Sequence, residues 1–180
     1  MTRALIPMLA MAVTAMAATS DPVPSVSVRE SNGAFTVEAT FDVSAPADVV
    51  RDVLTDYDGI PRFMPDIRLS VVRARAGDDV VVEQRAESKF LLFSKTVHLI
   101  LNVTEGERVI AFRDVCGKSF DRYEGAWTVA PRGDRATVFY TLTADPAFTV
   151  PAAVLRRLLD RNARQTIDQL RAEAARRATN

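Results

Sequence analysis

Residues 151–177 read PAAVLRRLLDRNARQTIDQLRAEAARR, and this segment is the basis of our fold prediction. Five of its residues recur at helical spacing and form a largely apolar stripe, with charged residues on the opposite side. The stripe consists of Leu155, Leu159, Ala163, Thr166 and Leu170. At 1.5 Å per residue the segment would span about 40 Å. We therefore expect one long amphipathic helix that lies across a sheet formed by the residues before it.

Two polar residues, Asn162 and Thr166, fall within this stripe when the helix is drawn at about 100° per residue. Buried polar groups need hydrogen-bond partners. Each side chain could bond a neighbouring backbone group. Alternatively, the stripe could face a cavity in which both side chains offer hydrogen bonds to a ligand, and this alternative makes them candidates for a binding site.

The first residues have the pattern of a secretory signal peptide, which we assign to residues 1–17. Arg3 precedes an uncharged run, and Ala15 and Ala17 flank Met16 in the small-x-small pattern of a cleavage site. The run is short and rich in alanine for a membrane span, so an uncleaved anchor is only the alternative. We expect residues 18–34 to form a leader and an N-terminal hairpin arm, and the protein to be bacterial and periplasmic or secreted.

The composition argues against several classes of function. The chain has 23 basic and 23 acidic residues, so its charge gives no reason to expect nucleic acid as a partner. Cys116 is the only cysteine and His98 the only histidine, which rules out a disulfide within the chain and gives no close spacing of zinc ligands. Strand parity places His98 outside and Cys116 at a strand end, which disfavours a Cys–His nucleophile. We expect no metal and no cofactor, and we assign no catalytic residue.

The middle of the chain predicts a sheet with two short helices inserted after its first strand. Residues 35–43 alternate as a half-buried strand. Ser44 is expected to cap a helix whose first turn includes Pro46, and a second short helix is expected around Ile60–Phe63. Six further strands between Ile67 and Ala144 are joined by short turns, which requires an antiparallel meander. The predicted fold class is α+β, with a curved antiparallel sheet of about seven strands wrapped on the long C-terminal helix.

Strand parity also identifies the side chains on the inner surface of this sheet. The inner set includes four residues with polar tips, and a dry core would hold fewer of these. With Phe112 and the stripe of the C-terminal helix, they make up our candidate ligand pocket. The pocket candidates are Gln84, Phe112, Tyr123, Trp127, Tyr140, Leu155, Leu159, Asn162 and Thr166.

Four large apolar residues, Phe90 to Phe93, occupy a predicted hairpin tip, where polar residues are expected. They could pack under the end of the long helix. Alternatively, they could form an apolar lip that guides a lipid into the cavity or makes a transient membrane contact. Together with an apolar pair near the second short helix, they are our candidates for the pocket mouth. The mouth candidates are Phe63, Met64, Phe90, Leu91, Leu92 and Phe93.

Several motifs resemble the START-like (helix-grip, SRPBCC) superfamily, in particular its polyketide cyclase/dehydrase and coenzyme Q-binding branch. The matching segments are SAPADVV at 44–50, LTDY at 54–57, FMP at 63–65, YEGAW at 123–127 and the entry into the last helix at 148–151. The resemblance covers roughly Phe35 to Ala175, and we treat residues 35–178 as one domain of this kind. It implies a cavity between sheet and helix that holds a lipid, quinone or similar molecule. A signal peptide is a departure from the quinone-binding members.

We therefore expect an exported binder or carrier of a hydrophobic small molecule. The alternative is a polyketide cyclase or dehydratase that uses the same cavity and needs an acid and a base within it. Tyr123, Tyr140, Asp114 and Asp121 are available for such chemistry. A buried Asp114 would favour the enzyme, and an Asp114 paired with an arginine at the rim would favour the binder. A third alternative is an interaction module with a solid core, and the sequence leaves the ligand, the partners and the oligomeric state open.

Overall fold

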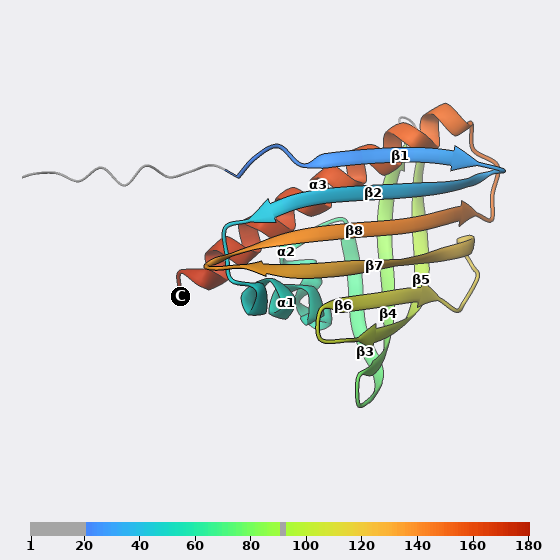
Figure 1. The fold of residues 1–180 in the computed structure, drawn as a ribbon. Coiled ribbons are helices and arrows are strands. Elements are labelled where there is room, and N and C mark those ends of the chain that lie inside the picture. Colours follow the sequence, from blue (N-terminus) through green and yellow to red (C-terminus); the bar gives the residue numbers. More distant parts are fainter. Residues whose placement is uncertain (1–20, 91–92) are drawn as a thin grey trace, which may run out of the picture.

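An antiparallel sheet of eight strands dominates the computed structural model, which describes residues 21–90 and 93–180 (Figure 1). The strands are β1 Ser25–Ser31, β2 Ala34–Val43, β3 Ile67–Ala76, β4 Asp79–Phe90, β5 Phe93–Glu105, β6 Val109–Asp114, β7 Phe120–Arg132 and β8 Arg135–Pro146. Their spatial order is β1-β2-β8-β7-β6-β5-β4-β3. Each strand from β3 to β8 pairs antiparallel with the next one along the chain, which confirms the predicted meander.

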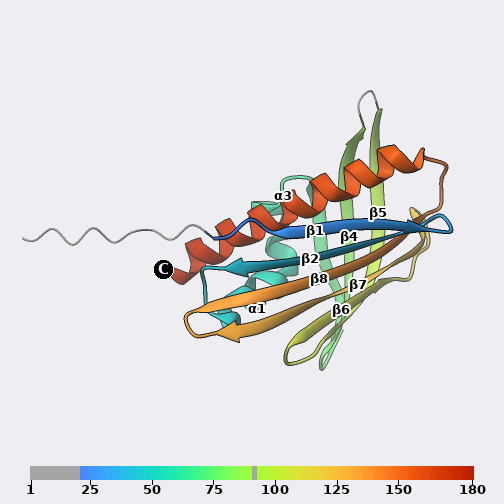
Figure 2. The ribbon, with the colours of Figure 1, turned by 45° about the horizontal axis from the view of Figure 1, so that its top comes forward.

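The helices lie where the sequence predicted them. The short helices follow β2, and the long helix follows the last strand and runs obliquely across the sheet (Figures 1 and 2). Their bounds are α1 Ala47–Thr55, the 3-10 turn η1 Tyr57–Gly59, α2 Ile60–Phe63 and α3 Ala152–Ala178. The predicted cap of α1 was wrong, because Pro46 is its N-cap residue and makes no side-chain cap. Ser44 Oγ instead donates a hydrogen bond to Asp21 Oδ1 at 2.6 Å.

The strand count was also slightly wrong, because β1 is a full member of the sheet. Asn32 and Gly33 have φ angles of 53° and 87°, as a tight hairpin turn requires. β1 then pairs with β2 from Ser25↔Thr40 to Ser31↔Ala34 and contacts α3. The sequence predicts an N-terminal hairpin arm here and does not count it as a strand of the sheet, since only two valines alternate with polar residues in this segment. The sheet therefore has eight strands rather than about seven.

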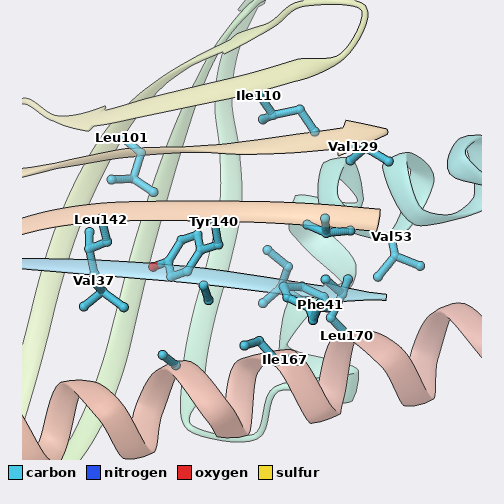
Figure 3. Packing of buried hydrophobic residues seen from close by; sticks show 14 of the residues in the cluster. Val37, Phe41, Val53, Leu101, Ile110, Val129, Tyr140, Leu142, Ile167 and Leu170 are labelled. Atoms are coloured by element: carbon cyan, nitrogen blue, oxygen red, sulfur yellow. The ribbon is translucent and has the colours of Figure 1, made fainter. Parts of the chain in front are cut away.

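The C-terminal half of α3 packs densely against the inner face of the sheet. Ile167, Leu170 and Ala174 are each 0% exposed. The same apolar cluster includes Phe41 from β2 and Val53 from α1 (Figure 3). Burial of this continuous apolar surface is the main favourable term that holds helix and sheet together.

The buried face of α3 is broader than the predicted stripe. Leu158 and Ile167 are buried beside the predicted residues, since α3 contacts β1 and β2 as well as α1. The two polar residues of the stripe differ from each other, because Thr166 is half-buried and Asn162 is exposed. The side of α3 that carries the stripe is therefore tightly packed along one part of the helix and open to solvent along another.

Charged side chains fasten the C-terminal end of α3 to the neighbouring elements. Arg177 contacts Asp56 at 2.6 Å and Glu173 at 2.7 Å, and its guanidinium lies 5.9 Å from the ring centroid of Phe63. Arg171 Nε donates a hydrogen bond to the Asp42 carbonyl oxygen at 2.8 Å. These contacts and the packed face together fix the position of this half of the helix.

Some predictions concern residues outside the described part of the chain. The signal peptide assigned to residues 1–17 is one of them, and Leu91 and Leu92 are two more. The backbones of Phe90 and Phe93 pair at the end of the β4–β5 hairpin. The side chains of residues 88–95 also lie outside the described part, so the fate of the apolar tip stays a prediction. Among the described residues, no helix has the length and apolar character needed to cross a membrane.

Candidate functional site

A cavity of about 520 Å³ lies between the N-terminal half of α3 and the inner face of the sheet. Its apolar lining consists of Val37, Met64, Ile67, Ala86, Val97, Leu99, Phe120, Leu142, Leu155, Leu158, Leu159 and Ala163. Its polar lining consists of Asp66, Gln84, Glu87, Tyr123, Tyr140, Arg161, Asn162, Gln165, Thr166 and Gln169. This volume and the mixture of apolar walls with a few polar groups are typical of sites for small organic molecules.

Tyr123 enters the cavity from β7 and is held by two phenylalanine rings. Its ring centroid lies 4.9 Å from that of Phe120 and 6.0 Å from that of Phe112. Phe112 fits there because residue 125 is glycine. A Cβ atom on Gly125 would fall 2.8 Å from Phe112 Cζ and 2.1 Å from the Thr141 carbonyl oxygen. The absence of a side chain at Gly125 thus allows the packing that supports Tyr123.

Tyr140 enters the cavity from β8 and stacks on Trp127, the residue opposite it on β7. The two ring centroids are 3.9 Å apart and the ring planes differ by 19°. Tyr140 is only 7% exposed. Figure 3 shows its hydroxyl oxygen on the side of the ring that faces Val37 and Leu142, two residues that also line the cavity. The indole therefore positions the phenol, and the phenol reaches the cavity.

Both phenols are neutral hydrogen-bond donors at physiological pH. Burial raises the pKa of Tyr123 to about 12, and the negative charge of Asp114 adds to the effect. Burial also raises the pKa of Tyr140 well above its ordinary value, with a smaller contribution from Tyr123. Among the described residues, neither hydroxyl has a hydrogen-bond partner. A third inner polar residue, Gln84, does have one, because its Nε2 donates to Ser70 Oγ at 3.1 Å.

The charged groups of the lining lie at the rim, where several are paired. Gln165 Nε2 donates to Asp66 Oδ2 at 2.8 Å. Glu87 contacts Arg68 at 2.9 Å. Arg161 of α3 is exposed. The cavity therefore has a charged rim and an uncharged interior.

The structure brings most of the predicted pocket residues together. Gln84, Tyr123, Tyr140, Leu155, Leu159, Asn162 and Thr166 all line the cavity, and so does the mouth candidate Met64. Three other candidates are described residues that do not line it. Phe112 lies behind Tyr123, Trp127 lies against Tyr140, and Phe63 lies beneath Arg177. Phe90, Leu91, Leu92 and Phe93 have no described side chains, so their place at the mouth stays a prediction.

The carboxylate of Asp114 accepts hydrogen bonds from backbone N–H groups at and beside the turn between β6 and β7. Its Oδ1 accepts hydrogen bonds from the N–H of Ile100 at 2.8 Å and of Cys116 at 3.2 Å, and its Oδ2 accepts one from Gly117 at 3.0 Å. It is half-buried, so it matches neither the buried acid nor the arginine-paired acid that we considered. Asp121 is exposed.

His98 belongs to a polar cluster on the outer face of the sheet. Its Nε2 lies 3.2 Å from Glu83 Oε1, and Arg73 contacts the other oxygen of Glu83 at 2.6 Å. The hydrogen bond from Arg73 is the main cause that lowers the pKa of Glu83 to about 2. Cys116 Sγ contacts the backbone oxygen of His98 at 3.5 Å rather than its imidazole. The described residues contain no group of three or more His, Cys, Asp and Glu side chains that could hold a metal ion.

A second and larger hollow, of about 780 Å³, lies on the outer face of the sheet. It is more open than the inner cavity, and exposed side chains such as Arg75, Asn102, Arg113 and Thr141 surround it. We place the candidate site in the inner cavity, since that cavity is covered by α3, has apolar walls and contains two hydroxyls that have no partner within the described part of the chain.

Sequence reasoning missed much of the lining. Parity had assigned Leu99 and Leu142 to the inner face, but parity does not distinguish a cavity wall from solid core. Gln165 and Gln169 follow Asn162 at intervals of three to four residues along α3. That helical spacing was a usable signal, because it places polar side chains on the same side of the helix as Asn162.

Comparisons with known proteins agree with this geometry. The family model described as polyketide cyclase / dehydrase and lipid transport matches residues 34–175. No curated protein matches the chain in sequence. Among solved structures, a START superfamily protein from Mycobacterium smegmatis aligns with a TM-score of 0.68 at 18% identity, over 78% of this chain and 97% of that one.

Two further structures represent the two activities named in the family description. The Zhui aromatase/cyclase from Streptomyces sp. R1128 aligns with a TM-score of 0.66 at 21% identity, over 80% of this chain and 95% of that one. The STAR-related lipid transfer protein from Xanthomonas axonopodis aligns with a TM-score of 0.63 at 18% identity, over 83% of this chain and 98% of that one. At these identities the structures establish the START-like helix-grip fold alone. Because the family model spans most of the sequence, the chain belongs to the polyketide cyclase/dehydrase and lipid transport family.

Proposed function

We propose that the protein is an exported binder or carrier of a hydrophobic small molecule, which it holds in the cavity between the sheet and α3. The observation that carries the proposal is the composition of that cavity. Aliphatic side chains from the sheet and the helix form its walls, and a paired, charged rim surrounds them. An apolar molecule that leaves water for such a cavity gains roughly 25 cal/mol per Å² of buried apolar surface.

The titratable groups of the cavity favour binding over catalysis. General acid–base catalysis is most efficient when the pKa of the catalytic group lies near the working pH. The pKa values of Tyr123 and Tyr140 are raised well away from neutrality, so both phenols are suited to holding a ligand by hydrogen bonds rather than to transferring protons. Asp114 is not part of the cavity lining, and its carboxylate accepts hydrogen bonds from backbone N–H groups.

The alternative function is a cyclase or dehydratase that acts in the same cavity. Its specific support is the pair of phenol hydroxyls for which the described residues offer no partner, because donors of this kind can polarise a carbonyl group. The family description names such enzymes beside lipid transport. In that case a keto-containing substrate would be converted on incubation with the protein, whereas a binder would return it unchanged.

The experiment is mass spectrometry of organic extracts from the protein purified out of its native cells, with two matched variants beside it. Thr166→Phe places a ring in the inner cavity, and Thr141→Phe places the same ring on the outer face at the larger hollow. We expect the same hydrophobic compound in extracts of the wild type and of Thr141→Phe, and a smaller amount of it in extracts of Thr166→Phe. Loss of the compound in Thr141→Phe alone would place the ligand outside, and empty extracts throughout would contradict stable binding.

The exported location rests on residues 1–17 alone and needs its own test. N-terminal sequencing of the protein from cell fractions is expected to find a chain that begins near Ala18 in the periplasm or the medium. A full-length chain in the cytoplasm would contradict this part of the proposal. Transient membrane contact through Phe90–Phe93 also stays a prediction, and flotation of the mature chain with phospholipid vesicles would measure it.

A further inference from the structure

The two phenol hydroxyls are the unusual feature of a mostly apolar interior. A buried hydroxyl without a hydrogen-bond partner destabilises the folded state, and most buried side-chain hydroxyls in proteins therefore have a partner. Among the described residues, Tyr123 and Tyr140 have none, although Tyr57, the other tyrosine, donates to Glu105 Oε1 at 2.9 Å. A partner for the two inner hydroxyls therefore has to come from the contents of the cavity.

The strand register directs both hydroxyls to one region of the cavity. Tyr140 lies opposite Trp127, and Leu142, the next inward residue of β8, lies opposite Gly125. Tyr123 is the next inward residue of β7 beyond Gly125. Because the Tyr140 oxygen lies on the Leu142 side of its ring, it is directed toward the Tyr123 end of the strand pair (Figure 3). The two donors thus approach a common space from adjacent strands.

The charge of the surroundings restricts what can occupy that space. Among the described side chains, the charged ones that line the cavity are Asp66, Glu87 and Arg161, which lie at its rim. A carboxylate or phosphate at the buried end would lose its hydration without a cation beside it, and that loss is expensive. A neutral oxygen acceptor avoids this cost and also satisfies the two hydroxyls.

Resting on the function proposed above, we infer that the ligand carries an uncharged carbonyl-type oxygen at its buried end, which accepts hydrogen bonds from Tyr123 and Tyr140. Ketones, quinones and esters with an apolar body belong to this class. Plain hydrocarbons and molecules that bury an ionised head do not. Phe112, Phe120 and Trp127 are then positioning residues, since their rings hold the two phenols in place.

Isothermal titration calorimetry of the mature chain with three probes of nearly equal shape tests the inference. The probes are methyl naphthyl ketone, ethylnaphthalene and naphthoate. One or two hydrogen bonds to the ketone correspond to about tenfold tighter binding than that of ethylnaphthalene. We expect this ratio in the wild type, with naphthoate the weakest of the three at neutral pH.

Tyrosine variants provide the matched controls. In Tyr123→Phe and Tyr140→Phe we expect the preference for the ketone to fall toward one, while the affinity for ethylnaphthalene stays unchanged. Tyr57→Phe, which removes a hydroxyl outside the cavity, is expected to keep the full preference. Equal binding of ketone and ethylnaphthalene by the wild type, or tightest binding of naphthoate, would overturn the inference and leave hydrophobic binding intact. Failure of all three probes to bind would instead count against the proposed function itself.

Discussion

The two halves of α3 both bury an apolar face, but the surroundings of these two faces are very different. In the C-terminal half, Ile167 and Leu170 are 0% exposed and meet the sheet and α1 directly. In the N-terminal half, Leu155 and Leu159 are also buried, yet they line a cavity of about 520 Å³. An apolar helical stripe therefore predicts burial, but it does not predict whether the space opposite the helix is filled.

The two halves of α3 also differ in their polar contacts with the rest of the molecule. Arg177 and Glu173 join the C-terminal end to Asp56 and thus to the short helices. The N-terminal half contributes polar side chains to the cavity instead, among them Arg161 and Asn162. One half of the helix thus packs tightly against the core, while the other half forms a wall of the cavity. The following predictions test this division.

The largest effect is expected from Leu170→Ala in the packed half. Truncation of a fully buried leucine removes apolar contacts and leaves a void, which costs about 3–5 kcal/mol in the free energy of unfolding. Leu159→Ala in the hollow half should cost less, about 2 kcal/mol, because its side chain already borders empty space. Urea unfolding followed by circular dichroism measures both losses. Equal losses would show that the two halves are packed alike.

A smaller loss, of about 2–3 kcal/mol, is expected from Trp127→Ala. The indole is half-buried and stacks on Tyr140 at 3.9 Å, so its removal costs packing and also releases the phenol from its position. Trp127→Phe is the matched control and should recover much of the stability. A change in unfolding free energy too small to measure in Trp127→Ala would show that the indole does not support the core.

The fold could be predicted from the sequence because its signals are local. Alternation gives strands, and helical spacing gives α3. The turn chemistry at Asn32 and Gly33 marked the first hairpin, yet the eighth strand was missed. Full membership of β1 in the sheet also depends on contact with α3, and a short run of two valines and several polar residues carries no sign of that contact.

The candidate site was predicted only in part, because parity reports which face a side chain takes and not its depth. Phe112 and Trp127 are on the predicted face, but each lies behind or beside a tyrosine instead of lining the cavity. The reason is steric, since the space above Gly125 admits the Phe112 ring. This arrangement of one ring behind another depends on several side chains from different strands at once. The alternation of residues along a single strand does not predict it.

Alkaline pH should reveal the buried phenol of the hollow region. Tyr123 has an ordinary pKa of about 10.0 in the unfolded chain and a raised pKa of about 12 in the folded one. Between these two pH values the unfolded state has lost a proton that the folded state keeps. The contribution of Tyr123 to stability is therefore fully present below about pH 10 and is lost as the pH rises toward about 12. The contribution of one such group is about 1.4 kcal/mol per pH unit.

The comparison of wild type with Tyr123→Phe isolates this contribution. Urea unfolding at a series of pH values above 10 should give a shallower decline in the variant, by about one proton. Absorbance of the folded wild type should show no phenolate from Tyr123 until pH approaches about 12. Identical slopes in the two proteins would show that the Tyr123 hydroxyl is open to water in the folded state.

The smallest change in stability is expected from Asn162→Leu at the open side of α3. The residue is exposed at the rim, and exposed substitutions usually change the unfolding free energy by less than about 0.5 kcal/mol. Its amide nevertheless lines the cavity, so loss of one hydrogen bond to a bound molecule would weaken binding about two- to tenfold. Asn102→Leu, an exposed asparagine on the outer face, is the matched control and should change neither quantity. Unchanged ligand retention in Asn162→Leu would remove Asn162 from the pocket and shift the binding role toward the deeper tyrosines. Weakened retention at constant stability would show that the hollow half of α3 is specialised for the ligand at little cost to the fold.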